Sequence, residues 1–215
     1  FGNENTYTYS AWFNTNDYTA GQMIYMQANT GNNNPLSGLY ITANEITLFH
    51  RDDAGTSASP SFGISSDTWY HVVGVREAKD VFKLYVNGDL KDTDTTNVGT
   101  TTLNAENIGC GHLAIGNFAF MDGEIDNVQI WDRALTSEDV LELNNTGGSS
   151  WGKYPKESSM DTLVYANMTD SVGWDVTVNL TDSTYYTINE ADNDLIGYWK
   201  LDGNYVDSSN TGHDG

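Results

Sequence analysis

The clearest alternation of apolar and polar residues lies in the middle of the N-terminal half. β-Branched and aromatic residues dominate two segments, Trp69–Arg76 and Val81–Val86, and the polar corner Glu77–Asp80 separates them. Asn87-Gly88 then supplies the two residues that tolerate φ > 0 in a type I′ turn, so Asp89–Asp92 is expected to fold back as a third strand. Such a meander has at least one apolar face, which another layer of the chain must cover.

The same pattern predicts more short strands on both sides of this meander. Tyr7–Phe13 alternates cleanly between apolar and polar positions. A helix is predicted at Ser137–Leu143, because Thr136 or Ser137 can cap it and two acids follow in its first turn. The remaining predicted strands are Gln22–Ala28, Gly38–Thr42, Glu45–Arg51, His112–Asn117, Gly123–Trp131, Thr162–Tyr165, Trp174–Leu180 and Tyr185–Ile188, with loops at Asn29–Pro35 and Asp52–Ser61. The sequence therefore predicts an all-β fold: an antiparallel jelly-roll β-sandwich with one short helix, a small β segment and a C-terminal strand.

Composition and charge narrow the partners that the chain can bind. Its 215 residues include 30 acidic and 9 basic ones, which gives a formal charge of −21 at pH 7. Such a surface repels nucleic acid and anionic membranes, so neither is expected as a partner, whereas cations are favoured. The chain has no run of about 18 apolar residues, so no membrane insertion is predicted. Three sequons, at Asn144, Asn167 and Asn179, are typical of an exported protein, and we expect an extracellular or cell-surface location.

Four segments resemble motifs of one known family. They are Trp69–Val72, Phe82–Gly88, Leu113–Gly116 and Asp122–Leu135, the last of which joins the strand GEIDNVQIW to Asp-Arg-Ala-Leu. Together they look like the laminin-G-like, concanavalin A-like jelly-roll superfamily over roughly Tyr7–Leu143. The resemblance implies two stacked antiparallel sheets, a use in extracellular recognition and, often, one structural Ca²⁺.

Each end of the chain lacks what the other end contains. Members of this family usually open with a strand that runs into an L-D-G-N segment, but this chain starts directly in the Tyr7–Phe13 strand. The segment Leu195–Gly215, which begins LIGYWKLDGN, resembles that opening strand. A sandwich without its opening strand exposes unpaired backbone, and an isolated strand cannot bury its apolar face. We therefore interpret Tyr198, Trp199 and Leu201 as the centre of a donor strand.

Three arrangements would complete the sandwich. In the first, the chain is a segment of a longer array of such domains. In the second, it passes its last strand to the next copy, and in the third it closes on itself. Rejoining the two ends would still omit a stretch that usually lies between these motifs in the family, which disfavours closure. The expected organisation is a jelly-roll domain at 1–150 that lacks its opening strand, a small β spacer at 151–194, and an opening strand at 195–215 that is available to the next copy.

The resemblance also implies a calcium site. In relatives the acid of the penultimate strand lies beside the opening D-G-N segment, which would bring Asp126 together with Asp202, Asn204 and Asp207. Oxygen ligands at this density suit Ca²⁺, which takes about 6 to 8 of them. The alternative interpretation is that these acids only cap polar turns. We expect a structural Ca²⁺ as the cofactor.

A second acidic motif bears on catalysis. Glu124, Asp126 and Gln129 resemble the E-x-D-x-x-E strand of retaining β-glucanases in the same superfamily. Gln129 stands where the third acid is expected, and an amide cannot donate a proton to a leaving group. The sequence therefore predicts that the protein is not an enzyme.

Two functions remain open. The first is a non-enzymatic extracellular structural or adhesive repeat, which links head to tail through its C-terminal β-strand into a surface array or filament, with its own copies or neighbouring repeats as partners. The alternative is a lectin-like glycan-binding module of a larger secreted or surface protein. Aromatic residues of a β-sandwich more often form its core than bind sugars. Those available for stacking on a sugar are Tyr18, Tyr25, Tyr40, Trp12 and Trp151.

Overall fold

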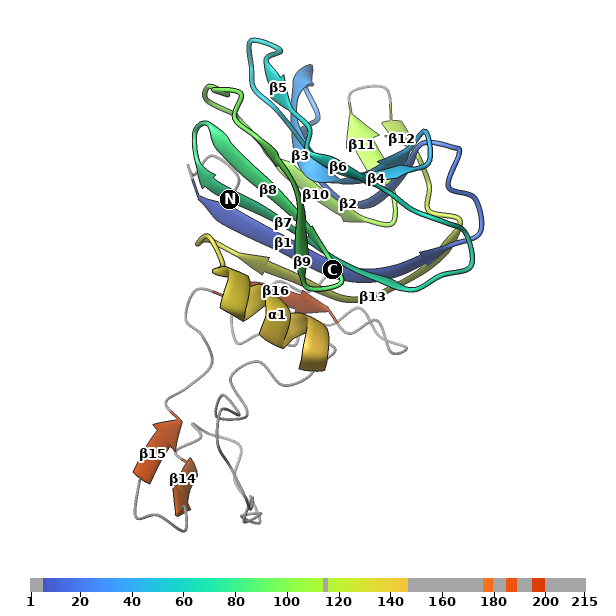
Figure 1. The fold of residues 1–215 in the computed structure, drawn as a ribbon. Coiled ribbons are helices and arrows are strands. Elements are labelled where there is room, and N and C mark those ends of the chain that lie inside the picture. The colour runs from blue at the N-terminus through green and yellow to red at the C-terminus, as the bar shows by residue number, and fades with distance from the viewer. Residues whose placement is uncertain (1–5, 114–115, 147–175, 180–184, 189–194, 200–215) are drawn as a thin grey trace.

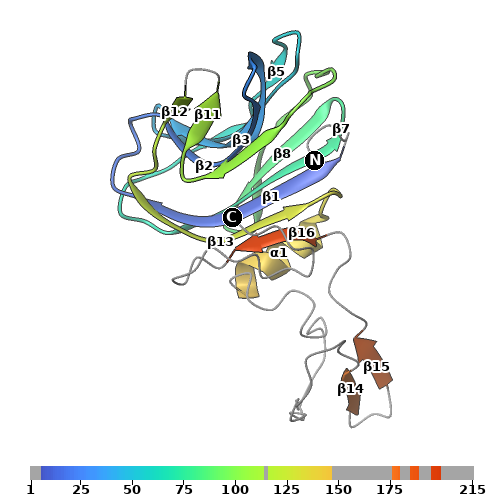
Figure 2. The ribbon, with the colours of Figure 1, turned by 180° about the vertical axis from the view of Figure 1, so that it is seen from behind.

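The chain forms two stacked antiparallel sheets, as Figures 1 and 2 show from opposite sides. They come from a computed structural model, which describes residues 6–113, 116–146, 176–179, 185–188 and 195–199. The two-layer jelly roll predicted from the alternation pattern is confirmed for this part of the chain. The predicted strand Thr162–Tyr165 lies outside it.

Sheet A has six strands, and its order differs from the order along the chain. Its strands run in the spatial order β16-β13-β1-β7-β8-β9. The bounds are β1 Tyr7–Thr15, β7 Tyr70–Ala78, β8 Val81–Val86, β9 Asp89–Asp94, β13 Gly123–Trp131 and β16 Leu195–Trp199. The predicted meander is therefore one half of this sheet, and β16 is an edge strand.

Sheet B stacks on sheet A. Its spatial order is β10-β2-β3-β4-β5, and β6 also pairs with β4. The bounds are β2 Gln22–Asn29, β3 Asn32–Thr42, β4 Glu45–Arg51, β5 Ser57–Ala58, β6 Ser61–Gly63 and β10 Ala105–Ile108. Two hairpins complete the described strands: β11 Gly111–Leu113 with β12 Gly116–Phe118, and β14 Val176–Asn179 with β15 Tyr185–Ile188.

The main core lies between the sheets, because alternate residues of each strand point to the same side. Tyr7, Tyr9, Ala11 and Phe13 of β1 all point inward and are at most 1% exposed. They pack against inward residues of sheet B and of the meander, among them Leu39, Ile41, Ile46, Leu48, Val72, Phe82 and Leu84. The apolar face that the meander pattern required is thus covered by sheet B.

Helix α1 (Ser137–Thr146) covers part of the other face of sheet A. Val140 and Leu143 of α1 pack with Val73 and Trp131, which point outward from sheet A. Thr8 is fully buried and holds the segment before the helix by two hydrogen bonds. Its hydroxyl donates to the carbonyl of Arg133 at 2.8 Å and accepts from the backbone N–H of Leu135 at 3.0 Å.

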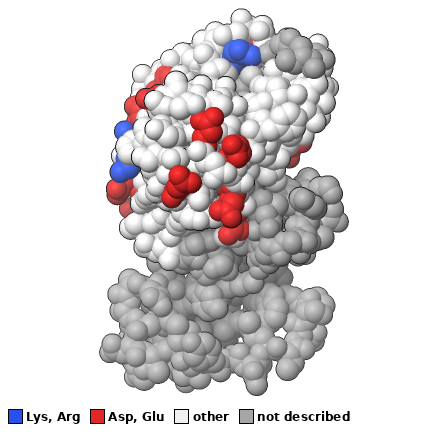
Figure 3. Space-filling view, turned by 90° about the vertical axis from the view of Figure 1, so that its right-hand side faces the viewer, with Lys and Arg blue, Asp and Glu red and all other residues white. Residues whose placement is uncertain are grey.

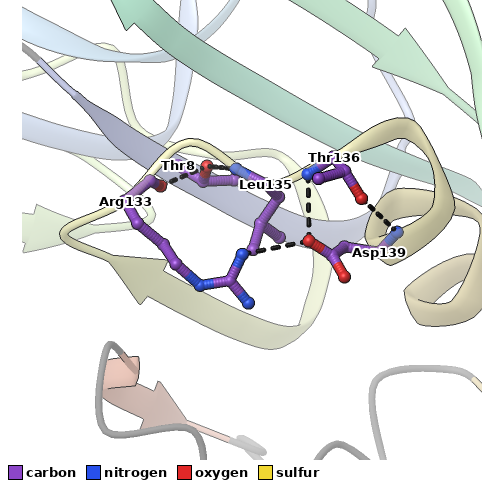
Figure 4. A network of polar contacts seen from close by, with 5 residues as sticks. All are labelled: Thr8, Arg133, Leu135, Thr136 and Asp139. Carbon is purple, nitrogen blue, oxygen red and sulfur yellow. Dashed lines mark hydrogen bonds and ion pairs between the residues drawn. The ribbon is translucent and has the colours of Figure 1, made fainter.

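A capping box starts the helix, as Figure 4 shows. Asp139 accepts from the backbone N–H of Thr136 at 2.9 Å, and its own N–H donates to the Thr136 hydroxyl at 3.2 Å. Arg133 also binds this carboxylate at 3.0 Å. Burial opposes ionisation of Asp139, but these hydrogen bonds outweigh it and lower its pKa. The Arg-Ala-Leu motif therefore acts as a clamp between the sheet and the helix.

Replacing Asp139 by alanine is expected to lower the free energy of unfolding by about 1 to 2 kcal/mol, because both the cap and the ion pair are lost. Urea unfolding followed by tryptophan fluorescence measures this difference. Glu138→Ala is the matched control, since Glu138 is an exposed acid in the same helical turn. Equal destabilisation by the two variants would show that the clamp contributes nothing.

Several boundaries differ from the predictions. The expected loop Asn29–Pro35 is wrong from Asn32 onward, because β3 already pairs with β2 at Asn32 and continues through Pro35 to Leu36, where its pairing with β4 begins. The predicted strand His112–Asn117 is instead a tight hairpin of β11 and β12. The predicted loop Asp52–Ser61 contains the two-residue strand β5 and the first residue of β6. In each case pairing with a neighbouring strand outweighed local residue preference.

Turn chemistry was predicted correctly where glycine or asparagine fixed it. Asn87 and Gly88 have φ of 53° and 84°, as a type I′ turn requires, and they join β8 to β9. Ala43 and Asn44 also have positive φ, at 50° and 73°, between β3 and β4. The second of these turns fixes the register of β3 and β4, which carry the candidate site.

Candidate functional site

The outer face of sheet B carries a grid of side chains that the core leaves free to point outward. Strand register aligns them in three rows across the sheet. The rows are Met23-Tyr40-Thr47, Asn107-Met26-Gly38-Phe49, and Ala105-Ala28-Leu36-Arg51. We call Tyr40, Thr47, Phe49, Arg51 and Asn107 the aromatic face.

A glycine at the centre of the grid keeps this face flat. The β2 strand is irregular between Met23 and Tyr25, and this brings the carbonyl of Tyr25 into the space that a Cβ on residue 38 would occupy. Gly38 is therefore required for β2 and β3 to approach each other. As a consequence no side chain separates Met26 from Phe49 on the outer surface.

The hairpin β11–β12 covers one side of the grid. Leu113 is buried with Met23 and Met26, and Phe118 packs against the same cluster. Figures 1 and 2 both place this hairpin beside β2. Tyr40 and Phe49 remain half-buried beyond the hairpin, with part of each ring open to solvent.

Arg51 is the only Lys or Arg in the described strands of sheet B. Its guanidinium carbon lies 5.7 Å from the ring centre of Phe49, which is within cation–π range. Its Nε also donates to the backbone carbonyl of Asn34. The positive charge is therefore held against the aromatic ring rather than extended into solvent.

A chain of buried polar groups supports this face from below. Arg76 lies within 3.2 Å of His50 Nε2, and His50 Nδ1 lies 2.8 Å from the Tyr7 hydroxyl. The Tyr7 hydroxyl lies 3.0 Å from that of Ser37, which in turn lies 3.0 Å from Tyr9. A guanidinium can only donate, so Nε2 of His50 accepts and Nδ1 carries the proton. Strands β1, β3, β4 and β7 are thereby joined across the core.

Burial dominates the electrostatics of this chain. Burial, helped by the positive charge of Arg76, lowers the pKa of His50 to about 3. Burial likewise raises the pKa of Tyr7 above its ordinary range. His50 is therefore neutral at pH 7, and the network can exist only with one charged member, Arg76.

The predicted donor strand lies within its own chain. β16 pairs antiparallel with β13, and Val128 is opposite Trp199, Gln129 opposite Tyr198 and Ile130 opposite Gly197. Closure on itself, which the missing stretch disfavoured, is the arrangement that the structure adopts for these residues. Leu201 lies outside the described residues.

The predicted calcium ligands are only partly described. Asp126 is half-buried on β13 and accepts from the backbone N–H of Asn127 at 2.8 Å. The other three residues, Asp202, Asn204 and Asp207, lie outside the described part of the chain. Within that part, no group of three or more His, Cys, Asp or Glu residues is placed to hold a metal ion.

The motif compared with β-glucanases lies on the outer face of sheet A. Asn127 has φ of 49° and forms a bulge, so that Glu124, Asp126 and Gln129 pair with Asn14, Trp12 and Ser10 on one face of β1. Gln129 is 1% exposed. The buried amide of Gln129 therefore occupies the position expected for the third acid, next to the edge strand β16.

The three sequons lie in different parts of the chain. Asn144 lies in the last turn of α1 and Asn179 ends β14, while Asn167 lies outside the described residues. Glycosylation of all three stays a prediction.

The aromatic residues singled out from the sequence separate into three groups. Tyr40 lies on the aromatic face, while Tyr25 is 1% exposed in the core and Tyr18 packs against the core. Trp12 points to the other side of the sandwich and stacks on His71 with 5.1 Å between ring centres. Trp151 lies outside the described residues. Phe49 and Arg51 were missed, although their alternation with Leu48 and His50 in a predicted strand placed them on the side opposite to the core.

No helix among the described residues has the length and apolar character needed to cross a membrane.

Solved structures share this fold at low sequence identity. The carbohydrate-binding module CBM40 of the Ruminococcus gnavus IT-sialidase, bound to α2,3-sialyllactose, aligns with a TM-score of 0.57 and 16% identity, over 66% of this chain and 84% of that one. The heptameric SAP-like pentraxin of Limulus polyphemus aligns with a TM-score of 0.54 and 21% identity, over 68% and 72%. Identities this low establish the fold alone.

Sequence comparisons identify one relative and the family of the chain. The human Adhesion G-protein coupled receptor D1 is 29% identical over 100 residues, which cover 44% of this chain. The chain spans about a tenth of that receptor's length, since the match covers 11% of it. Residues 1–141 match the family described as the Concanavalin A-like lectin/glucanases superfamily, and this match takes in β1 to β13 and the start of α1. The chain belongs to the Concanavalin A-like lectin/glucanases superfamily.

Proposed function

We propose that the protein is an extracellular recognition module that binds carbohydrate on its aromatic face and acts by binding rather than by catalysis. The observation that carries this proposal is the position of Tyr40 and Phe49, which leave the core and present their rings beside Thr47 and Asn107. Ligand sites combine apolar and aromatic surface with a few placed polar groups, and this face has that composition. The Ruminococcus gnavus module bound to a sialylated sugar has the same fold, which supports the proposal.

The chemistry of a sugar suits such a surface. One face of a pyranose ring presents C–H groups that pack on an aromatic ring, while its hydroxyls need hydrogen-bond partners. Phe49 has no side chain between it and Met26, because Gly38 intervenes, so a flat ring can lie across this position. The hydroxyl of Tyr40 and the amide of Asn107, both half-buried, supply donors and acceptors at its edges, whereas Thr47 beside them is 6% exposed.

Replacing Phe49 by alanine is expected to weaken carbohydrate binding by about 10-fold, because a stacking partner worth roughly 1.4 kcal/mol is lost. Isothermal titration calorimetry with a glycan selected on an array measures the change, and Tyr40→Ala is expected to act in the same direction. Trp69→Ala is the control, since Trp69 is a 43% exposed aromatic residue that precedes β7 on sheet A. Unchanged affinity in both Phe49→Ala and Tyr40→Ala would show that the binding site lies elsewhere.

Strand exchange between copies is a second candidate function, and the position of β16 favours it. This strand is at the edge of sheet A and is separated from α1 by residues 147–194, so another copy could supply the same pairs with β13. Such exchange would join modules into an array or filament. An adhesive surface protein would use it to link neighbouring repeats.

Deleting residues 195–215 is expected to abolish any assembly and to expose the edge of β13. Light scattering of the full chain and of the truncated chain, each measured over a range of concentrations, tests this. Filaments or ladders that vanish on deletion would support exchange. A full chain that stays monomeric at every concentration would limit β16 to closing its own domain.

A structural Ca²⁺ is proposed beside Asp126 of β13. β16 runs antiparallel to β13 and ends at Trp199 opposite Val128, so its C-terminal end points toward Asp126. Asp202, Asn204 and Asp207 follow in the sequence, and oxygen ligands from these residues would suit the ion. Ca²⁺ is then expected to raise the melting temperature of the protein, and Asp126→Asn to reduce that increase. A melting temperature that does not respond to Ca²⁺ would contradict the site.

A further inference from the structure

We infer that the aromatic face binds an extended oligosaccharide chain of about four sugar units, which lies along β4 between Glu45 and Arg51. The ligand length and direction assigned here rest on the proposed function and extend it, since stacking on Phe49 alone needs only one sugar ring. Glu45 and Arg51 become the two ends of the site. We call the outward residues of β4, which are Glu45, Thr47, Phe49 and Arg51, the β4 strip.

The accessible part of the outer face is longer along the strands than across them. Hairpin β11–β12 packs on β2, where Met23 and Met26 are only 3% and 1% exposed. The half-buried or exposed side chains of β3 and β4 beyond this hairpin are those of Tyr40, Glu45, Phe49 and Arg51. A ligand that contacts both Tyr40 and Phe49 therefore extends along β4, because the hairpin limits it on the β2 side.

The β4 strip is regular over its whole length. The pairing of β3 with β4 runs from Leu36 opposite Arg51 to Thr42 opposite Glu45 without a register shift. At a rise of about 3.3 Å per residue the strip spans about 20 Å, which one pyranose ring cannot cover but an extended chain of about four rings can. Tyr40 is opposite Thr47, so it is a diagonal neighbour of Phe49 at about 7 to 8 Å. The two aromatic rings are therefore placed to contact successive sugar rings.

Each end of the β4 strip has a charged hydrogen-bonding group. Glu45 is exposed, and Ser61 Oγ donates to its Oε2 at 3.0 Å, which holds the carboxylate in place. At the other end the guanidinium of Arg51 lies over Phe49, and Nε, one of its several donors, binds the Asn34 carbonyl. Sugar hydroxyls both donate and accept, and their hydrogen bonds to charged groups are stronger than those to neutral ones. Only a chain that spans the strip reaches the acceptor at one end and the donors at the other.

Isothermal titration calorimetry tests the length. The full chain is titrated with β1,4-linked glucose, mannose and N-acetylglucosamine oligomers of one to six units, since such linkages give extended chains. In a series that binds, affinity is expected to rise by about 10-fold, or about 1.4 kcal/mol, from two to four units and to level off beyond four.

Two variants test the ends of the site. Glu45→Ala and Arg51→Met are each expected to weaken tetrasaccharide binding by about 5-fold while disaccharide binding stays within about 2-fold of wild type. Methionine keeps an apolar stem beside Phe49 but supplies no donor. Retained disaccharide binding shows that each variant is folded.

A matched control separates the end contacts from the general charge of the protein. Acidic side chains are spread over the sandwich, as Figure 3 shows for one side of it. Glu138→Ala removes an exposed acid from α1, which covers sheet A rather than sheet B, and is expected to leave both affinities unchanged.

The possible failures can be told apart. Equal affinity for the disaccharide and the tetrasaccharide of a series that binds would overturn the length and leave carbohydrate binding intact. Full tetrasaccharide affinity in both Glu45→Ala and Arg51→Met would overturn the assignment of the ends. Absence of binding to every oligomer would overturn the extended-chain site, and absence of binding to a glycan array as well would overturn the proposed function with it.

Discussion

Replacing Arg76 by leucine is expected to lower the free energy of unfolding by about 3 kcal/mol. Arg76 is 1% exposed, and its guanidinium approaches His50 Nε2, the Val98 carbonyl and the Ala78 carbonyl. It also lies 5.2 Å from the ring centre of Phe82. Leucine fills part of the volume but donates no hydrogen bond, so these buried acceptors lose their partner. Removing a buried charge returns some desolvation energy, which is why the loss is expected to stay near 3 kcal/mol rather than exceed it.

Lys83→Leu is the matched control, because it removes a cation from the adjacent strand. Lys83 forms an ion pair with Glu77 at 2.7 Å, and both side chains are partly exposed. Such pairs contribute less than about 1 kcal/mol. Urea unfolding of the two variants measures the difference. If both lose the same small amount, the buried network does not hold strands β1, β4 and β7 together.

Acid is expected to destabilise the protein as the pH falls from about 6.5 toward 4. Burial lowers the pKa of His50 to about 3 and that of His71 to about 4, whereas a histidine in the unfolded chain has a pKa near 6.5. Between these values the unfolded state binds protons that the folded state cannot, so stability falls with falling pH and is constant above 6.5. Each histidine contributes roughly 1.4 kcal/mol per pH unit in this window, and the two together cost on the order of 6 kcal/mol.

Protonation of the carboxylates has two opposed effects. It reduces the net charge of −21 and the repulsion that follows from it, but it costs stability at Asp52, Asp94 and Asp139, whose pKa values are lowered in the folded protein. His50→Gln isolates the histidine contribution: the slope of unfolding free energy against pH is expected to fall by about half in this window. Tyr7→Phe is the control, since it removes the 2.8 Å partner of His50 but keeps the titrating group. Equal slopes in wild type and His50→Gln would contradict the assignment.

The fold was predictable to the extent that local patterns determine it. β4, β8 and β13 begin and end where alternation and turn residues placed them, and so does the turn at Asn87-Gly88. Those features depend on neighbours in sequence. The course of β3 through Pro35 and the split of β11 from β12 depend on partners far along the chain, and a single sequence does not contain that information directly.

The candidate site was harder to predict for the same reason. Tyr40 was named among aromatic residues, but its role depends on which side of β3 faces the second sheet. Phe49 was placed in a predicted strand and then left aside, because alternation alone does not say whether an outward face is open or covered. The position of β16 was undecided because the missing stretch weighed against closure, whereas pairing with β13 satisfies its backbone within one chain.

The place of β16 has a consequence for biosynthesis. Sheet A needs residues 195–199 beside residues 128–131, although more than sixty residues separate them. While the ribosome adds that intervening chain, β13 has already emerged and its outer edge has no partner. The nascent protein therefore passes through a period in which the edge of β13 can pair with an edge strand of another molecule. Rapid export would shorten this period, and a bound chaperone would protect the edge during it.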